Sequence, residues 1–223
     1  MSRRRRGSVE VGRAGSQSLA HRSTYAVFYV VAEGEGTECD YFDRLDKAYG
    51  PCGRFRIRMP LHHVRRNGLQ PADVVEHACG LAGDPDIKQV WGLFDHDGRN
   101  NIDQVCSTAK RERIEVALSH PSFELWLLLH FQDFTSAAQG GESETITGKL
   151  RNAHSAFADY EKRNKRIDQS RFAALMQDDG IHNAVRRARR LSGHFAHETP
   201  SQRDPSTEVF RLIEALGIVP PAS

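Results

Sequence analysis

Two stretches of the chain are apolar at almost every position, which is the pattern of strands buried on both faces of a sheet. Residues 25–32 read Tyr-Ala-Val-Phe-Tyr-Val-Val-Ala, and residues 89–94 read Gln-Val-Trp-Gly-Leu-Phe. Residues 55–64 begin by alternating between apolar and basic side chains, and residues 113–118 form a further apolar segment. All four are short and flanked by turn-forming or polar residues, so the pattern predicts four β-strands.

Apolar residues recur at helical spacing in the segments that follow these strands. The first helix carries Tyr41, Phe42, Leu45 and Ala48 and is expected to end at Gly50-Pro51. Further helices are predicted over residues 71–81, 102–110 and 125–131. The strand–helix–strand order predicts an α/β fold, in which four parallel strands form one sheet with helices packed on its faces.

The character of the sequence changes after residue 131. Residues 135–147 are polar and predicted as a loop, and helices are predicted over residues 149–163, 168–176, 181–192 and 206–216. Residues 1–23 contain too few bulky apolar groups to fold and are expected to be disordered. We therefore expect a disordered basic tail (1–23), an α/β domain (24–134) and a helical, basic C-terminal region packed on that domain (135–223).

Composition and charge exclude few classes of function. The 223 residues are 39% hydrophobic and 27% charged, and the net charge of +2 alone predicts neither a nucleic-acid partner nor an acidic one. No apolar run reaches the roughly 18–20 residues of a membrane span, and no apolar stretch follows the N-terminal arginines as in a secretory signal. The four cysteines form no CxxC pair, which argues against a zinc site. A reducing cytoplasm is the expected setting, with no membrane association.

Acidic side chains follow two of the predicted strands at their carboxyl ends. Glu33 follows the first strand, and Asp95 and Asp97 follow the third. Ligands of open parallel sheets bind at this edge, and carboxylate oxygens suit Mg²⁺ or Mn²⁺. Each motif alone is also an ordinary turn or an acid at the start of a helix. Together they predict a metal site, and His120, after the fourth strand, is a candidate for phosphate contact or proton transfer.

Basic side chains are crowded into the predicted C-terminal helices. This stripe could hold a nucleic-acid backbone, hold an acidic partner protein, or form a solvated face, and the sequence leaves all three open. Arg3–Arg6 leave a similar choice between a phosphate-seeking arm and a solubilising tail. The candidate nucleic-acid-binding residues of the helices are Lys162, Lys165, Arg186, Arg187, Arg189 and Arg190.

Three motifs together resemble the RloB-like family, whose members are linked to restriction and phage-defence loci and carry a Toprim-type domain. The resemblance covers about residues 24–216. Its most specific part is the Ser-x-Pro-x-Phe-Glu-x-Trp block, which the generic Toprim pattern does not contain. The motifs are Val30-Val-Ala-Glu-Gly-Glu-Gly-Thr-Glu38 with Tyr41-Phe42, Leu93-Phe-Asp-His-Asp97, and Ser119-His-Pro-Ser-Phe-Glu-Leu-Trp-Leu-Leu-Leu-His-Phe131.

The resemblance implies a Toprim-like sheet of four parallel strands and Mg²⁺-dependent chemistry on nucleic-acid phosphodiesters. It equates Glu33 with the Toprim glutamate, and Asp95 and Asp97 with the Toprim DxD. Glu38 lies five residues after Glu33, whereas Toprim nucleases of the overcoming-lysogenisation type place their second acid four residues on, so Glu38 is an open candidate ligand. Glu124 is expected in the first turn of a helix, either as a further ligand or as an acid that stabilises the helix N-terminus.

Two hypotheses for the function follow. The first is a Mg²⁺-dependent nuclease of phage or plasmid defence, in which Glu33, Asp95 and Asp97 hold the metal. The alternative is a non-catalytic subunit that binds nucleic acid or a partner ATPase, which the resemblance to the RloB-like family implies because such genes often neighbour an ATPase. The chain itself has no GxxxxGK[ST] motif and is not expected to hydrolyse ATP alone. The nuclease hypothesis requires the three acids to converge and none of them to be buried against a lysine or arginine.

Overall fold

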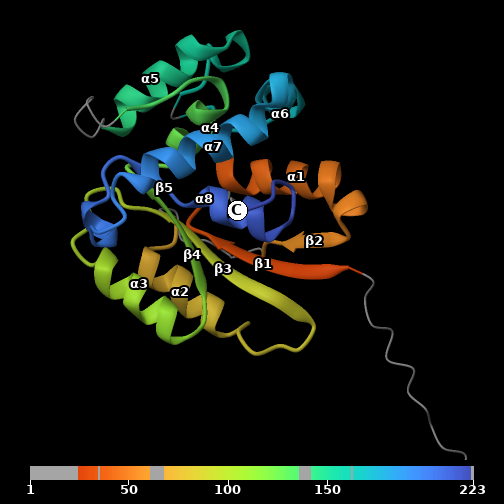
Figure 1. The fold of residues 1–223 in the computed structure, drawn as a ribbon, viewed down its shortest axis with the longest axis vertical. Coiled ribbons are helices and arrows are strands. Elements are labelled where there is room, and N and C mark those ends of the chain that lie inside the picture. The colour runs from red at the N-terminus through yellow and green to blue at the C-terminus, as the bar shows by residue number, and fades with distance from the viewer. Residues whose placement is uncertain (1–24, 35, 61–67, 136–141, 162, 222–223) are drawn as a thin grey trace, which may run out of the picture.

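The computed structural model describes residues 25–34, 36–60, 68–135, 142–161 and 163–221. The predicted basic tail, the last four residues of the predicted strand 55–64, and Lys162 lie outside these ranges. In the described part, one sheet lies between two layers of helices, and a further group of helices stacks on one of those layers (Figure 1).

The sheet has five strands in the order β2-β1-β3-β4-β5. The first four are parallel, as predicted, and the two longest, β1 and β3, lie side by side. The prediction of a purely parallel four-stranded sheet is wrong at one edge, because β5 pairs antiparallel with β4. The strands are β1 (Ala26–Ala32), β2 (Phe55–Arg58), β3 (Ile87–Asp95), β4 (Glu115–His120) and β5 (Ser206–Thr207).

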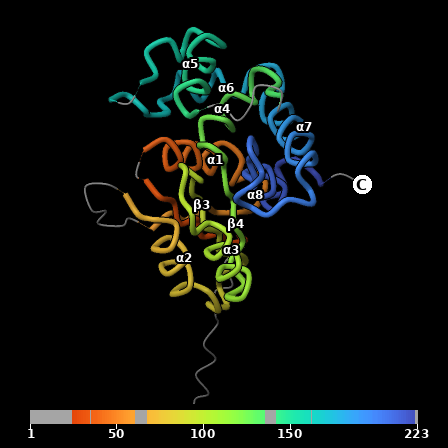
Figure 2. Tube along the Cα trace, turned by 90° about the vertical axis from the view of Figure 1, so that its left-hand side faces the viewer, coloured from red at the N-terminus to blue at the C-terminus, as the bar shows by residue number. Residues whose placement is uncertain are grey.

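Helices cover both faces of the sheet. α2 and α3 lie on one face, α1 and α8 lie on the other, and α5, α6 and α7 lie beyond α1 and α4 on that second side (Figure 2). The helices are α1 (Thr37–Gly53), α2 (Pro71–Cys79), α3 (Ile102–Arg111), α4 (Glu124–Phe131), α5 (Ser143–Ala153), α6 (Gln169–Met176), α7 (Gly180–Gly193) and α8 (Val209–Ala215).

The continuous apolar pattern of β1 has a simple structural cause, because both faces of this central strand are buried. Val30 belongs to the core cluster under α1, α4 and α8, whereas Val31 points to the opposite face and packs with α2 and α3. The larger cluster draws residues from Phe28 to Val219. The predicted division of the chain at residue 134 remains a prediction, but side chains from both sides of it share this core.

Several predicted boundaries in the C-terminal region are wrong. The helix predicted over 149–163 ends at Ala153, because His154 takes an extended conformation and its ring accepts a hydrogen bond from the Ala156 N–H of a short 3₁₀ turn. The predicted polar loop 135–147 contains the first turns of α5, while its residues 136–141 lie outside the described ranges. The helix predicted from residue 206 begins at Val209, after strand β5.

The first helix also differs from its predicted end, since α1 runs through Pro51 to Gly53 and stops where Arg54 takes a left-handed conformation. Its first turn begins at Thr37, directly after the acidic loop that leaves β1. None of the helices in the described ranges combines the length and the apolar character that a membrane span needs.

Candidate metal centre

Four acidic side chains from four elements face one another at the carboxyl edge of the sheet. Glu33 follows β1, Asp95 ends β3, and Glu38 and Glu124 lie in the first turns of α1 and α4. Their charges act on one another, because Glu33, Glu38 and Glu124 each raise the pKa of Asp95. The sequence predicted the meeting of β1 and β3 at this edge, and the first turns of α1 and α4 bring two further acids to it.

Both the backbone and the side chain of Glu33 form hydrogen bonds. Its backbone N–H donates to the Leu93 carbonyl (3.1 Å), and its own carbonyl accepts from the Leu69 N–H (2.8 Å). One carboxylate oxygen accepts a hydrogen bond from the Asp95 backbone N–H at 3.2 Å, and the other forms an ion pair with Arg99. The hydrogen bond and charge of Glu33 raise the pKa of Arg99. The nuclease hypothesis requires that none of its three acids is buried against a lysine or arginine, and the Glu33–Arg99 ion pair does not meet that requirement. A metal site at this edge therefore has to rest on acids other than Glu33.

Glu124 is buried and has two neighbours that bind it. Lys165 Nζ lies 2.7 Å from Glu124 Oε1, and the Tyr160 hydroxyl donates to the same oxygen at 3.1 Å. Burial favours the neutral acid, but the charge of Lys165 and its hydrogen bond outweigh burial and lower the pKa of Glu124. Thr37 Oγ1 donates to the Lys165 carbonyl (2.8 Å) and lies 2.9 Å from the Tyr160 hydroxyl, so α1 fixes both partners of Glu124.

Glu38 and Asp95 are in a different electrostatic situation. In the described ranges, neither carboxylate forms an ion pair with a lysine or arginine. Burial, together with the charges of Glu124 and Glu33, raises the pKa of Glu38 to about 7. Burial and the three neighbouring glutamates likewise raise the pKa of Asp95 well above its ordinary value. Two partly buried carboxylates are thus crowded together without a basic counter-charge of their own.

Asp97 lies at the rim of the same centre. Its backbone has a positive φ of 42°, followed by Gly98 at 68°, so the chain turns sharply after β3. The side chain of Asp97 is exposed and lines a cleft that also contains Asp95. The predicted pair Asp95 and Asp97 therefore spans the cleft from its partly buried floor to its exposed rim.

The cleft has a volume of about 790 Å³ and lies between the carboxyl edge of the sheet and helix α5. Six of its lining side chains are acidic and two, Arg151 and Lys165, are basic. The acidic residues that line it are Glu38, Asp95, Asp97, Glu124, Glu144 and Glu161. Such an excess of negative charge favours a bound cation.

The carboxylates of the cleft have the chemistry of ligands for a hard divalent cation. In the part of the chain that the structure describes, no three His, Cys, Asp or Glu side chains already stand together at metal-binding geometry. Carboxylate oxygens are, however, the ligands of Mg²⁺ and Mn²⁺, and a cation would relieve the repulsion that raises the pKa values of Glu38 and Asp95. Glu38 and Asp95 would hold it, with Asp97 and Glu124 within the same cleft.

His120 is not among the residues that line the cleft. Its ring stacks on His96, with ring centroids 3.8 Å apart and planes 5° from parallel, and its Nε2 lies 3.8 Å from Asp204 Oδ2. Burial lowers the pKa of both histidines. Neither ring is among the side chains that line the cleft. A role of His120 in proton transfer remains a prediction, and its present contacts are with His96 and Asp204.

The predicted arginine stripe on α7 is largely engaged within the protein. Arg187 donates to the Leu129 and His130 carbonyls and, like Arg190, pairs with Asp133, while Arg189 pairs with Glu214. Arg186 is exposed and donates to the side chain of Asn183. Of the predicted nucleic-acid-binding residues in the described part of the chain, Lys165 alone lines the acidic cleft. Binding by the stripe remains a prediction.

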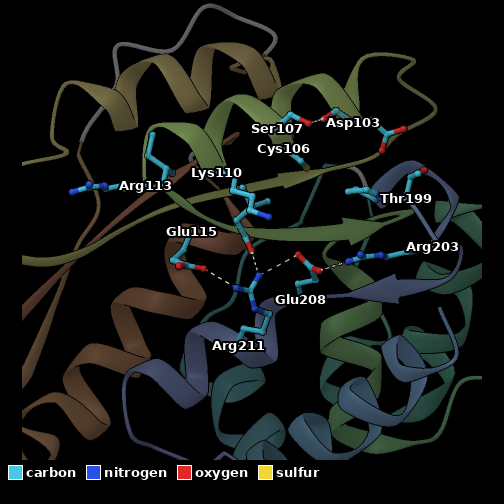
Figure 3. Close-up of a pocket in the computed structure, with 13 residues that line it drawn as sticks. Asp103, Cys106, Ser107, Lys110, Arg113, Glu115, Thr199, Arg203, Glu208 and Arg211 are labelled. Atoms are coloured by element: carbon cyan, nitrogen blue, oxygen red, sulfur yellow. Dashed lines mark hydrogen bonds and ion pairs between the residues drawn. The ribbon is translucent and has the colours of Figure 1, made fainter. Parts of the chain in front are cut away.

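A second cavity, of about 620 Å³, lies between α3, β4 and the start of α8. Figure 3 shows Glu208 between Arg203 and Arg211, with Arg211 also bonded to Glu115. The third acid, Asp103, accepts from the N–H and hydroxyl of Ser201. Because its acids are already bonded within the protein, this cavity lacks the surplus negative charge of the cleft at the sheet edge.

Sequence reasoning missed three residues of the centre. Arg99 lies two residues after the Asp-x-Asp motif, where a basic residue next to an acidic site is a usable signal. Tyr160 and Arg151 carry no such signal, because both are distant in sequence from the strand motifs: Arg151 lines the cleft from α5, and the buried Tyr160 contacts Glu124. Arg171 brings Tyr160 and Lys165 into place: its buried guanidinium donates to the Ala156, Asn164 and Arg166 carbonyls and to Asp159.

Comparison with known proteins finds one match. A family model described as RloB-like protein matches residues 28–216, which include every acidic residue of the centre. No curated protein and no solved structure matches the chain.

Proposed function

This chain belongs to the RloB-like protein family, and we propose that it is a nuclease that uses Mg²⁺ or Mn²⁺ to hydrolyse nucleic-acid phosphodiesters. The observation that carries the proposal is the pair Glu38 and Asp95, two partly buried carboxylates that have raised pKa values and form no ion pair with a lysine or arginine among the described residues. Burying and crowding acids costs stability, and a divalent cation offsets that cost.

The side chains divide into those that would hold the cation and those that prepare the site. Glu38 and Asp95 would bind it from the floor of the cleft, with Asp97 at the rim. Glu33 is bonded to Arg99 and to the Asp95 backbone, so it acts as a positioning residue that fixes the end of β3. A cation bound here would activate a water molecule and stabilise the charge that develops on the phosphate oxygens.

Lys165 is suited to binding the phosphate. Its ammonium group is partly exposed, faces Glu124, and is held in the charged state by Glu124, Asp95 and Glu38 despite partial burial. A phosphate bound in the cleft would take the place of Glu124 as the negatively charged partner of the Lys165 ammonium group. Lys165 would then neutralise the phosphate, and Glu124 would be released to join the ligand set.

The test is incubation of the purified chain with labelled RNA, single-stranded DNA and plasmid, with and without Mn²⁺. We expect cleavage of at least one substrate that depends on the metal and is lost in Asp95→Asn. The matched control is Asp43→Asn, which removes an exposed acid paired with Lys47 and should leave cleavage unchanged. Cleavage that persists in a folded Asp95→Asn variant, or no cleavage under any condition, would contradict the proposal.

A role in phage or plasmid defence is part of the proposal and rests on the family resemblance. We expect plaque formation to fall in cells that produce the wild-type chain together with its genomic neighbours, including any partner ATPase. Cells that produce Asp95→Asn in the same setting should lose that protection. Equal protection by both chains would favour the alternative, a non-catalytic binding subunit.

A further inference from the structure

We propose that the Lys165 side chain is an internal counter-ion of the centre, and that a divalent cation has to displace it from Glu124 before Glu124 becomes a ligand. This inference rests on the proposed function and adds its regulation, because the Glu124–Lys165 ion pair is then an autoinhibitory contact that lowers metal affinity. Three observations carry it: the position of the ammonium group, the way in which the backbone of Lys165 is held, and a hydrogen bond that Glu124 keeps when Lys165 leaves.

The ammonium group of Lys165 lies where a cation bound by Glu124 would lie. Its nitrogen is 2.7 Å from Glu124 Oε1. Burial lowers the pKa of the ammonium group, but the charges of Glu124, Asp95 and Glu38 outweigh burial and raise it. All four side chains line the same cleft. A metal ion on the Glu124 carboxylate would repel a positive charge at this distance, so the metal and the ammonium group compete for Glu124.

The segment that carries Lys165 is fixed, whereas its side chain is able to leave. Thr37 donates to the Lys165 carbonyl at 2.8 Å, and Arg171 donates to the carbonyls of both flanking residues. The side chain of Lys165 is 39% exposed, against 5% for that of Glu124. The ammonium group therefore has a path to solvent that requires rotation of its own side chain and no movement of the backbone.

Glu124 keeps a hydrogen-bond partner when the ammonium group departs. The buried Tyr160 hydroxyl donates to Glu124 Oε1 at 3.1 Å and lies 2.9 Å from Thr37 Oγ1. Tyr160 thus continues to orient the carboxylate while a metal ion replaces the ammonium group as its counter-charge. The exchange avoids an uncompensated charge in a buried position, which would be costly.

Arg99, a second basic side chain next to the acids, is held differently. It pairs with Glu33 and also donates to the backbone carbonyl of Asp95 at 3.3 Å. Its side chain is 21% exposed, less than that of Lys165. With two partners and less access to solvent, Arg99 stays in place as a fixed counter-charge, and the exchange with a metal ion is assigned to Lys165.

Calorimetric titration of Mn²⁺ into Lys165→Met tests the competition. Removal of the ammonium group should raise Mn²⁺ affinity at least about tenfold, because no positive charge then has to leave Glu124. A merely structural ion pair predicts unchanged or lower affinity, since its loss leaves a buried acid without support. Lys165→Arg keeps the charge and should bind Mn²⁺ as weakly as the wild type. The matched control, Lys110→Met, removes an exposed lysine that lines the second cavity and should leave the affinity unchanged.

Amine labelling of the wild-type chain tests the displacement without a variant. Pulse acetylation with acetic anhydride, followed by mass spectrometry, should modify Lys165 several-fold faster in saturating Mg²⁺ than in EDTA, because the metal has moved the ammonium group away from Glu124. The exposed Lys110 is the internal reference and should react at the same rate in both solutions.

Equal acetylation of Lys165 in Mg²⁺ and in EDTA, or unchanged or weaker Mn²⁺ binding by a folded Lys165→Met variant, would overturn the inference. The proposed function fails separately. Metal-dependent cleavage by a chain whose Lys165 reacts equally in both solutions would retain the nuclease and remove the exchange. Metal-dependent labelling of Lys165 without cleavage of any nucleic acid would do the reverse, and absence of Mn²⁺ binding from both the wild type and Lys165→Met would remove both proposals.

Discussion

The carboxylate of Glu33 accepts a hydrogen bond from the backbone N–H of Asp95 at 3.2 Å. The first acid of the predicted metal site is therefore bonded to the backbone of the second, and its other oxygen is occupied by Arg99. This geometry gives Glu33 a positioning role, in contrast to the ligand role that its place in the motif implies.

The two roles predict different effects of Glu33→Gln. A glutamine keeps an oxygen that can accept from the Asp95 N–H but loses the ion pair with Arg99. We expect Mn²⁺ affinity to fall by roughly tenfold, as for residues that orient a ligand, and by more than about a hundredfold in Asp95→Asn. Isothermal titration of both variants measures the difference. An equal loss of Mn²⁺ affinity in the two variants would indicate that Glu33 is itself a metal ligand.

The raised pKa of Glu38 makes the stability of the metal-free protein depend on pH. The folded state keeps the Glu38 proton up to about pH 7, whereas the unfolded chain loses it near the ordinary value of 4.5. The folded state thus binds more protons across this window, so the free energy of unfolding should fall as pH rises from about 4.5 to 7. Asp95, whose pKa is raised for the same reasons, acts in the same direction.

Urea unfolding in EDTA at several pH values checks this. In Glu38→Gln, the free energy of unfolding should fall less steeply with rising pH. The variant should also be more stable than the wild type at neutral pH, because it lacks a charge that is destabilising in the folded state. The matched control, Glu144→Gln, alters an exposed acid of the same cleft and should leave the slope intact. A wild-type stability that rises between pH 4.5 and 7 with no contribution from Glu38 would refute the electrostatic description of the centre.

Arg171 should be the most costly arginine to replace. Its side chain is only 4% exposed and donates to three backbone carbonyls and to Asp159, which orders the segment that carries Tyr160 and Lys165. Arg171→Met leaves several buried acceptors without donors and should cost about 3–5 kcal/mol of folding free energy. Chemical denaturation measures it, with the exposed Arg166→Met as control at about 1 kcal/mol or less.

The sheet could be predicted from the sequence because its central strands are buried on both faces. The apolar runs of residues 25–32 and 89–94 match β1 and β3 closely, and the acids that follow them do meet at one edge. A two-residue strand such as β5 has no pattern of its own. It forms because the Ser119 and Thr207 hydroxyls meet at 2.9 Å and the Glu208 N–H reaches the Leu118 carbonyl.

The partners of the acids could not be predicted, because they depend on tertiary packing. Asp40 of α1 accepts from both Arg166 and the Ile167 N–H and, together with the contacts of Arg171, holds the segment that carries Lys165 beside Glu124. The arginines of α7 are a second case in which tertiary packing, which the sequence does not reveal, supplies the partners of charged side chains. Four arginines in five positions resemble a binding surface, yet Asp133 and Glu214 take up three of them.

Calorimetric titration of Mn²⁺ into the wild-type chain and into a Glu38→Gln, Asp95→Asn double variant at neutral pH tests the metal centre most directly. The wild type should bind with a saturable heat that the double variant lacks, while a Glu144→Gln, Glu161→Gln double variant retains it. Both double variants remove the same number of charges from one cleft, so nonspecific loss of charge is controlled. Binding that survives in the Glu38→Gln, Asp95→Asn variant, or that is absent from the wild type, would contradict the assignment of this edge of the sheet as a divalent-metal site.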